Sequence, residues 1–98
     1  MEYGVASWHG PNRNSRESRT ASGKKWNNGD LIAAHKSLPL GTFVQVTHLK
    51  TNRVVIVQIV DRGPYVRGRI VDLSPRAAEA SGITGSGVGK VKVEVVRL

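Results

Sequence analysis

The chain has 98 residues, the size of one small domain, and it contains no cysteine, which excludes disulfide bonds, thiolate zinc sites and cysteine nucleophiles. Fifteen Lys and Arg against seven Asp and Glu give a formal net charge of +8, which favours polyanionic partners such as nucleic acid, anionic lipid or an acidic cell-wall polymer. No apolar run approaches the roughly 18 residues that a membrane-spanning helix needs.

The first predicted elements are two weak strand candidates, at Gly4–Trp8 and Leu31–His35. The second could equally be one helical turn that is capped by Asp30. Between the two candidates, the segment from Gly10 to Gly23 is rich in Gly, Ser, Asn and Arg and is predicted to be a loop. A loop of this length in so small a domain usually binds something or moves.

Three clearer strands follow along the chain. Thr42–His48 alternates between polar and apolar residues, and Val54–Val60 is almost continuously apolar, as expected of a strand that is covered on both faces. Thr51–Arg53 lies between them, so the pair is predicted to form a hairpin. Lys90–Val95 alternates strictly, which predicts a half-exposed strand with its three valines facing the core.

One helix is predicted after these strands and before the last one. Ser74 is its N-cap, Pro75 occupies the first helical position, the helix continues through Ala80, and Gly82 ends it. Only 5% of the residues are aromatic, so small aliphatic side chains must fill the core. Together these features predict a mainly β fold, a compact closed barrel with one short helix, as a single domain over residues 1–98.

Asp61 is the first candidate for chemistry, because it stands where an apolar strand breaks into a Gly-Pro turn. Such a carboxylate can be held rigidly while its oxygens stay open to a ligand. The alternative is structural: Asp61 pairs with Arg62 or Arg69, or accepts hydrogen bonds from the turn. Asp72 is interpreted as structural, since it lies just before the helix N-terminus. Glycosidases usually need two carboxylates, and no second one looks like a partner for Asp61.

The histidines and aromatic residues leave alternatives open. His9, His35 and His48 match no metal-ligand spacing, so no metal site is expected, and His35 has the pattern of a packed ring with one nitrogen hydrogen-bonded. Three aromatic residues beside glycines are interpreted as core fillers, although an exposed ring in a groove would stack on a sugar; they are Trp8, Trp26 and Tyr65. Dispersed basic residues with few aromatics between them weaken a nucleic-acid interpretation.

The order of several motifs resembles the double-psi β-barrel domain of the rare lipoprotein A (RlpA) family. The segments that carry the resemblance span nearly the whole chain. They are Gly4–Trp8, Thr20–Gly23, Ala33–His35, Leu38–Thr42, Val46–Leu49, Val60–Tyr65 and Gly68–Ser74. The resemblance implies a six-stranded barrel with two interlocked psi loops.

The resemblance also implies a function in the cell envelope, periplasmic or secreted, although the N-terminus shows no export signal. Some members of the family are endolytic lytic transglycosylases, which cleave peptidoglycan between N-acetylmuramic acid and N-acetylglucosamine and leave 1,6-anhydro ends. Glycan strands are then the expected partner. No cofactor, no specific nucleic acid and no membrane span are expected, and we expect a monomer.

Carried over by position, the family's catalytic aspartate falls on Asp61 and its functional histidine falls on His35, which is expected to assist Asp61 by orienting it or by shuttling its proton. Its glutamate falls on Lys24, which departs from the family pattern. Four further residues are candidates for binding the substrate. They are Trp8, Ser22, Arg62 and Tyr65.

The lysine at position 24 opens an alternative. An ammonium near Asp61 would favour the ionised carboxylate and make it a poorer acid. The domain could then be a noncatalytic, expansin-like module that binds peptidoglycan or another polysaccharide, unless a group such as Glu17 in the long loop supplies the lost function.

Overall fold

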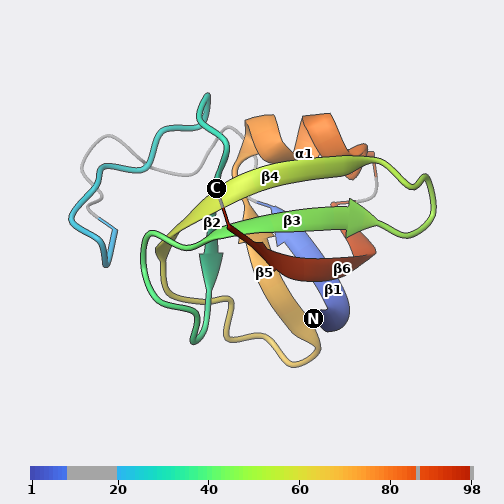
Figure 1. Ribbon diagram of the computed structural model, residues 1–98. Coiled ribbons are helices and arrows are strands. Elements are labelled where there is room, and N and C mark those ends of the chain that lie inside the picture. The colour runs from blue at the N-terminus through green and yellow to red at the C-terminus, as the bar shows by residue number, and fades with distance from the viewer. Residues whose placement is uncertain (9–19, 86, 98) are drawn as a thin grey trace.

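A computed structural model describes residues 1–8, 20–85 and 87–97 of the chain, and within them six strands close into one barrel that carries one short helix (Figure 1). Around the barrel the strands follow the order β1-β5-β2-β4-β3-β6. The elements are β1 (Glu2–Trp8), β2 (Ile32–His35), β3 (Phe43–His48), β4 (Val54–Asp61), β5 (Arg69–Leu73), α1 (Pro75–Ser81) and β6 (Val88–Val96). His9 and Glu17 lie outside the described residues.

The predicted barrel is confirmed, and so are most of its elements. The hairpin between β3 and β4 forms with Thr47 opposite Val54. The Leu31–His35 candidate is a strand and not a helical turn, because Ile32–His35 is paired with β4 on one side and β5 on the other. The residue pattern did not single out β5 as a separate strand.

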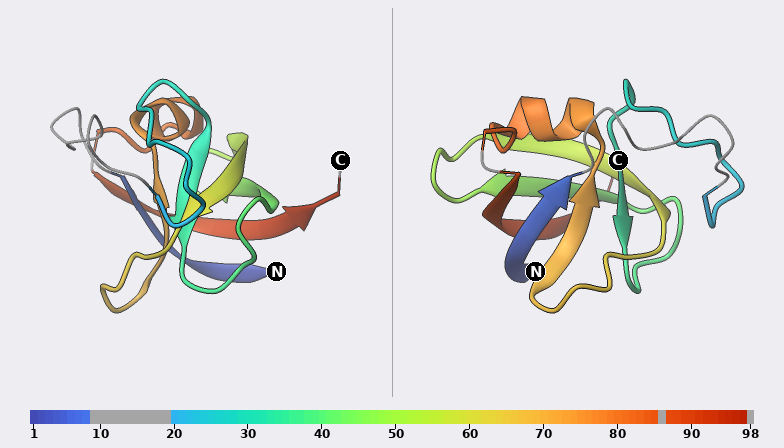
Figure 2. Two further views of the ribbon diagram at one scale, coloured as in Figure 1. Left: turned by 90° about the vertical axis from the view of Figure 1, so that its left-hand side faces the viewer. Right: turned by 180° about the vertical axis from the view of Figure 1, so that it is seen from behind.

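Two expectations about burial are wrong. The first half of β4 is covered on only one face, since Val54 and Ile56 are 51% and 40% exposed while Val55 and Val57 lie in the core. The reason is that the strand belongs to a single-layered barrel wall whose outer face at these positions meets water. At the end of the strand both Ile59 and Val60 are buried, as expected. Val95 is 56% exposed, because it lies near the end of β6, which runs on toward the C-terminus (Figure 2).

The helix begins and ends as predicted. The Ser74 side chain accepts a hydrogen bond from the Ala77 amide at 3.2 Å and donates one to the Asp30 carbonyl at 2.6 Å. Gly82 ends the helix in the left-handed conformation with φ of 80°. The described part of the chain contains no helix of the length and hydrophobicity that a membrane span requires.

Two irregularities in the parallel strand pairs decide which side chains face outward. The register shifts by one residue between Val5 and Ala6 in the β1·β5 pair, and between Ala33 and Ala34 in the β2·β4 pair. A regular ladder would set Ser7 opposite Val71 and Ala34 opposite Val60. Bulges of this kind turn a side chain to the other face of a sheet, and they are common beside functional sites.

The shifts align four residues from neighbouring strands at one level. Ser7 is opposite Asp72, Asp72 is opposite Ala34, and Ala34 is opposite Asp61. We call these four residues the site row. Because residues paired across strands project to the same face, both carboxylates face away from the barrel core. Asp61 and Asp72 are two strands apart, which corresponds to about 10 Å between their Cα atoms.

We expect Gly4→Ala to destabilise the barrel where the β1·β5 shift occurs. A Cβ at Gly4 would lie 2.6 Å from Cγ2 of the buried Ile70, so the Ile70 side chain or one of the two strands must move. The expected loss in free energy of unfolding is about 1–3 kcal/mol, measured by urea denaturation. Gly85→Ala is the matched control, because a Cβ there meets nothing within 4 Å. Equal stability of Gly4→Ala and the wild type would show that the contact is not rigid.

Candidate functional site

A groove of about 350 Å³ opens over the site row. Its walls are formed by the end of β1, by Ala34 and Asp72 of the site row, and by the turn that follows β4. We call it the Arg62 groove, and it is lined by Ser7, Trp8, Ala34, Arg62, Gly63, Pro64, Tyr65, Val66, Arg69 and Asp72. Three of the four predicted substrate-binding residues therefore line the groove, and Ser22 does not. Asp61 lies beside the groove, since its strand partner Ala34 and its chain neighbour Arg62 both line it.

Backbone amides hold the Asp61 carboxylate at the end of β4. Its Oδ1 atom accepts hydrogen bonds from the amides of Ala21 and Arg62, each at 2.9 Å. The Ser22 amide donates to the carbonyl of Val60 at 3.1 Å, so the turn that contains Ala21 is docked on the same strand end. The carboxylate is partly exposed and oriented by these bonds.

The turn that contacts Asp61 is closed by its own side chains. The Thr20 hydroxyl, which is nearly buried, donates to the Lys24 carbonyl at 2.6 Å and contacts the Ser22 hydroxyl at 2.8 Å. The Ser22 hydroxyl also accepts from the Lys24 amide at 3.2 Å. The turn thus uses the Ser22 hydroxyl and the Lys24 backbone for its own geometry, and the Lys24 side chain is exposed to solvent.

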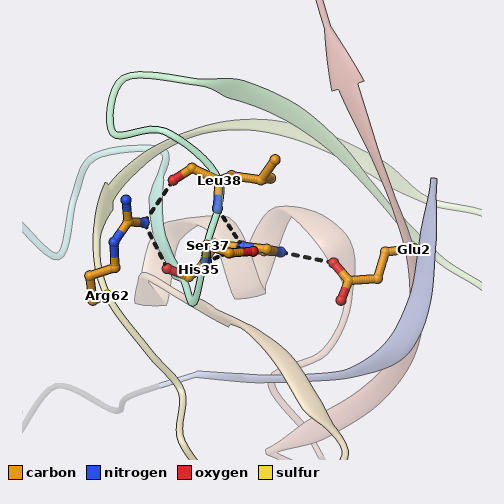
Figure 3. A network of polar contacts seen from close by, with 5 residues as sticks. All are labelled: Glu2, His35, Ser37, Leu38 and Arg62. Atoms are coloured by element: carbon orange, nitrogen blue, oxygen red, sulfur yellow. Dashed lines mark hydrogen bonds and ion pairs between the residues drawn. The ribbon is translucent and has the colours of Figure 1, made fainter.

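His35 faces away from the carboxylate that it was expected to assist. Its ring is buried, Nε2 lies 2.8 Å from Glu2 Oε1, and Nδ1 accepts from the amides of Ser37 and Leu38, each at 3.1 Å (Figure 3). Both ring nitrogens are therefore occupied by groups other than Asp61. The sequence suggested a packed ring with one bonded nitrogen, and the structure shows two.

Arg62 is anchored by carbonyls at the end of β2. Its Nη1 atom donates to the carbonyl of His35 at 3.1 Å and to that of Leu38 at 2.7 Å. These bonds fix the guanidinium beside the groove that it lines. Hydrogen bonds from a charged donor are stronger than those between neutral groups.

The three aromatic residues have different environments. Trp26 is 1% exposed and packs with Ile32 and Val60, so it is a core filler. Tyr65 is 75% exposed on the groove wall, so the core-filler interpretation is wrong for it. Trp8 is half-buried in the same wall, and within the described part of the chain its Nε1 atom has no hydrogen-bond partner.

Asp72 lies in the groove wall, which the structural interpretation of this residue missed. It is 6% exposed, and its Oδ1 accepts a hydrogen bond from the Ser7 hydroxyl at 3.2 Å. The sequence offered one signal: a carboxylate between the apolar residues Val71 and Leu73 contributes nothing to a strand's packing. In the ranges 1–8, 20–85 and 87–97, no cluster of three His, Asp or Glu side chains could hold a metal ion.

Comparison with known proteins identifies similar chains. The family described as "Lytic transglycolase" matches residues 1–93. A probable endolytic peptidoglycan transglycosylase RlpA from Synechocystis is 50% identical over 97 residues, which cover 99% of this chain and 30% of the relative. The endolytic peptidoglycan transglycosylase RlpA of Pasteurella multocida is 52% identical over 95 residues, covering 97% of this chain and 32% of that protein. The chain thus spans about a third of the length of these relatives.

Solved structures with the same fold include the expansin of Clavibacter michiganensis. The apo expansin and a mutant in complex with cellohexaose each superpose with a TM-score of 0.75 and 22% identity. Each match covers 97% of this chain and 50% of the expansin chain. At this level of identity the likeness supports the double-psi barrel fold alone.

We expect the two bonds to Asp61 Oδ1 to depend on an oxygen acceptor more than on charge. Asp61→Asn keeps an oxygen that can accept from both amides and should lower the free energy of unfolding by less than about 1 kcal/mol. Asp61→Ala leaves the Ala21 and Arg62 amides without this acceptor and should lower it by about 1–3 kcal/mol. Urea denaturation of both variants measures the difference, and equal losses would contradict this account.

Proposed function

The chain belongs to the RlpA family of lytic transglycosylase domains, and from this we propose that it cleaves peptidoglycan glycan strands internally, between N-acetylmuramic acid and N-acetylglucosamine. The single observation that carries the proposal is an oriented, partly exposed carboxylate, Asp61, at the edge of a groove with aromatic walls. Since the proposed substrate lies in the cell envelope, we infer a periplasmic or secreted location.

The proposed reaction needs one group that gives and then takes a proton. Asp61 in its acid form donates its proton to the glycosidic oxygen while the bond from that oxygen to C1 of N-acetylmuramic acid breaks. The C6 hydroxyl oxygen of the same sugar forms the new bond to C1, and the hydroxyl proton passes to the Asp61 carboxylate. The product is a 1,6-anhydro end, no water is consumed, and Asp61 regains its starting form.

The other groove residues suit a glycan in this scheme. Tyr65 and Trp8 present aromatic surface in the groove wall on which sugar rings can stack. Asp72 adds a second carboxylate to the groove wall. A negative charge there would stabilise the positive charge that develops at C1 in the transition state.

A second candidate function is supported by Lys24. This residue occupies the position of the family glutamate, and it belongs to the turn whose Ala21 amide contacts Asp61. A protonated lysine cannot act as a base, so this position no longer offers the reaction a carboxylate. The alternative is therefore a noncatalytic module that binds peptidoglycan or another polysaccharide in the same groove.

We expect Asp61→Asn to abolish the release of anhydro ends from purified glycan strands while binding to insoluble sacculi is retained. The substitution removes the transferable proton but keeps an oxygen acceptor for the turn, so turnover should fall at least about 100-fold. Product analysis by mass spectrometry measures the release, and cosedimentation measures binding.

Asp72→Asn is the matched control for the Asp61 experiment, because it changes the other carboxylate of the site row in the same way. We expect it to slow turnover without abolishing it. Full activity of Asp61→Asn would remove that residue from the chemistry, and if Asp72→Asn alone were inactive, the acid-base role would belong to Asp72.

Lys24→Glu distinguishes the catalytic function from the binding function. If the missing carboxylate at position 24 is what limits catalysis, the glutamate variant should release anhydro ends at least about 10-fold faster than the wild type, with unchanged binding to sacculi. Lys25→Glu, at the neighbouring exposed position, controls for the change in net charge. Equal and rapid product formation by wild type and Lys24→Glu would show that the lysine does not limit catalysis.

A further inference from the structure

The hydrogen bonds of His35 define which of its nitrogens carries the proton. Nδ1 accepts from the backbone amides of Ser37 and Leu38, so it presents a lone pair and has no proton. The proton of the neutral ring is then on Nε2, which points at the Glu2 carboxylate (Figure 3). This assignment follows from the bonding network.

A ring bonded in this way is unsuited to proton exchange with a substrate. A proton on Nδ1 would face two N–H donors and break both bonds. The Nε2 proton is already donated to Glu2 at 2.8 Å, and His35 is only 5% exposed. His35 therefore offers the groove neither an available proton nor an available lone pair.

The bonds of His35 instead shape the segment that holds Arg62. By binding the amides of Ser37 and Leu38, the ring fixes the chain as it leaves β2. Two carbonyls of this segment, those of His35 and Leu38, receive Nη1 of Arg62. The histidine ring thus binds the amides of this short segment, and the arginine binds its carbonyls (Figure 3).

Arg62 connects this segment to the carboxylate. Its backbone amide donates to Asp61 Oδ1 at 2.9 Å, while its guanidinium is anchored to the end of β2 and lines the Arg62 groove. Movement of the guanidinium would therefore change the shape of the groove wall. It would also shift the Arg62 amide, which is one of the two amides that orient the Asp61 carboxylate.

Glu2 completes the network from a distant part of the sequence. It lies on β1, 33 residues before His35, and alternation along the strand places it on the same face as the buried Ala6, which is the inside of the barrel. A carboxylate that accepts from Nε2 fixes both the tautomer and the orientation of an imidazole. Glu2 is itself 46% exposed, so it can be changed without opening the core.

We propose that Glu2 and His35 are positioning residues, which act through the Ser37–Leu38 segment to hold Arg62 in the groove wall and its amide on Asp61. His35 does not exchange protons with the substrate. The consequence for turnover rests on the proposed transglycosylase function, whereas the network itself does not.

The network is tested without any activity, by NMR of the ¹⁵N-labelled protein near pH 7. We expect His35 as the Nε2–H tautomer with unprotonated Nδ1 in long-range ¹H–¹⁵N spectra. Glu2→Ala should shift the amide signals of Leu38 and Arg62, whereas Glu94→Ala, which removes a half-buried carboxylate paired with Lys92 on β6, should not. A proton on Nδ1, or an unmoved Arg62 amide in Glu2→Ala, would overturn the proposal.

Kinetics on soluble glycan strands separate positioning from proton transfer. Asn can accept amide bonds from residues two and three positions ahead, so His35→Asn should preserve the segment, whereas His35→Ala should not. We expect His35→Asn to keep a kcat at least about 10-fold above that of His35→Ala. A proton shuttle requires both variants to be equally inactive. Equal inactivity would overturn the proposal if the amide chemical shifts of Ser37 and Leu38 were unchanged in the Asn variant.

Glu2 gives the matching kinetic test. Glu2→Ala should lower kcat about 10-fold, with KM changed less than about 2-fold. Glu2→Gln should recover most of the lost kcat, because its amide oxygen can accept a hydrogen bond from Nε2 of His35. Glu94→Ala should leave kcat and KM unchanged. An unchanged kcat in Glu2→Ala would overturn the proposal. If the wild type released no product, the transglycosylase function would fail, while the NMR experiment would still decide the network.

Discussion

The candidate site depends on two one-residue register shifts in the parallel strand pairs of the barrel. Strand side chains alternate between faces, so a regular ladder would set hydrophobic residues, Val71 and Val60, at the level now held by Asp72 and Asp61. Each shift moves a carboxylate to the outer face of the barrel, while other residues of the same strand still fill the core. The fold thereby obtains two outward carboxylates at one level without placing a charge among buried aliphatic side chains.

Backbone groups, more than side chains, hold this level of the barrel in place. The Ala21 and Arg62 amides bind Asp61, and the His35 and Leu38 carbonyls bind Arg62. Each of these backbone segments is in turn closed by a buried polar side chain, Thr20 in one case and His35 in the other. The arrangement gives the groove a rigid edge even though the barrel is small and its core is built mainly from valine, isoleucine and alanine.

The two buried histidines of the described residues have comparable roles at different places in the barrel. His48 Nδ1 bonds to the Ser81 carbonyl at 3.0 Å and packs over Gly89, where a Cβ would lie 2.9 Å from its Nε2. His35 bonds to Glu2 and to two backbone amides. In both cases a polar ring is buried with hydrogen-bond partners, which is the condition under which such burial is tolerated.

The sequence by itself determined the class of fold, the family, the hairpin, the last strand and the helix with both of its caps, because alternation, turn residues and capping residues act over a few neighbouring positions. It also singled out Asp61 and three residues of the groove wall, since these stand in motifs at strand ends. Only the tertiary structure decided that Asp72 joins them, that Tyr65 is exposed, that the first half of β4 is covered on one face and that His35 bonds to Glu2. Those outcomes depend on register shifts and on contacts between residues up to 65 positions apart, and no local pattern of residues encodes them.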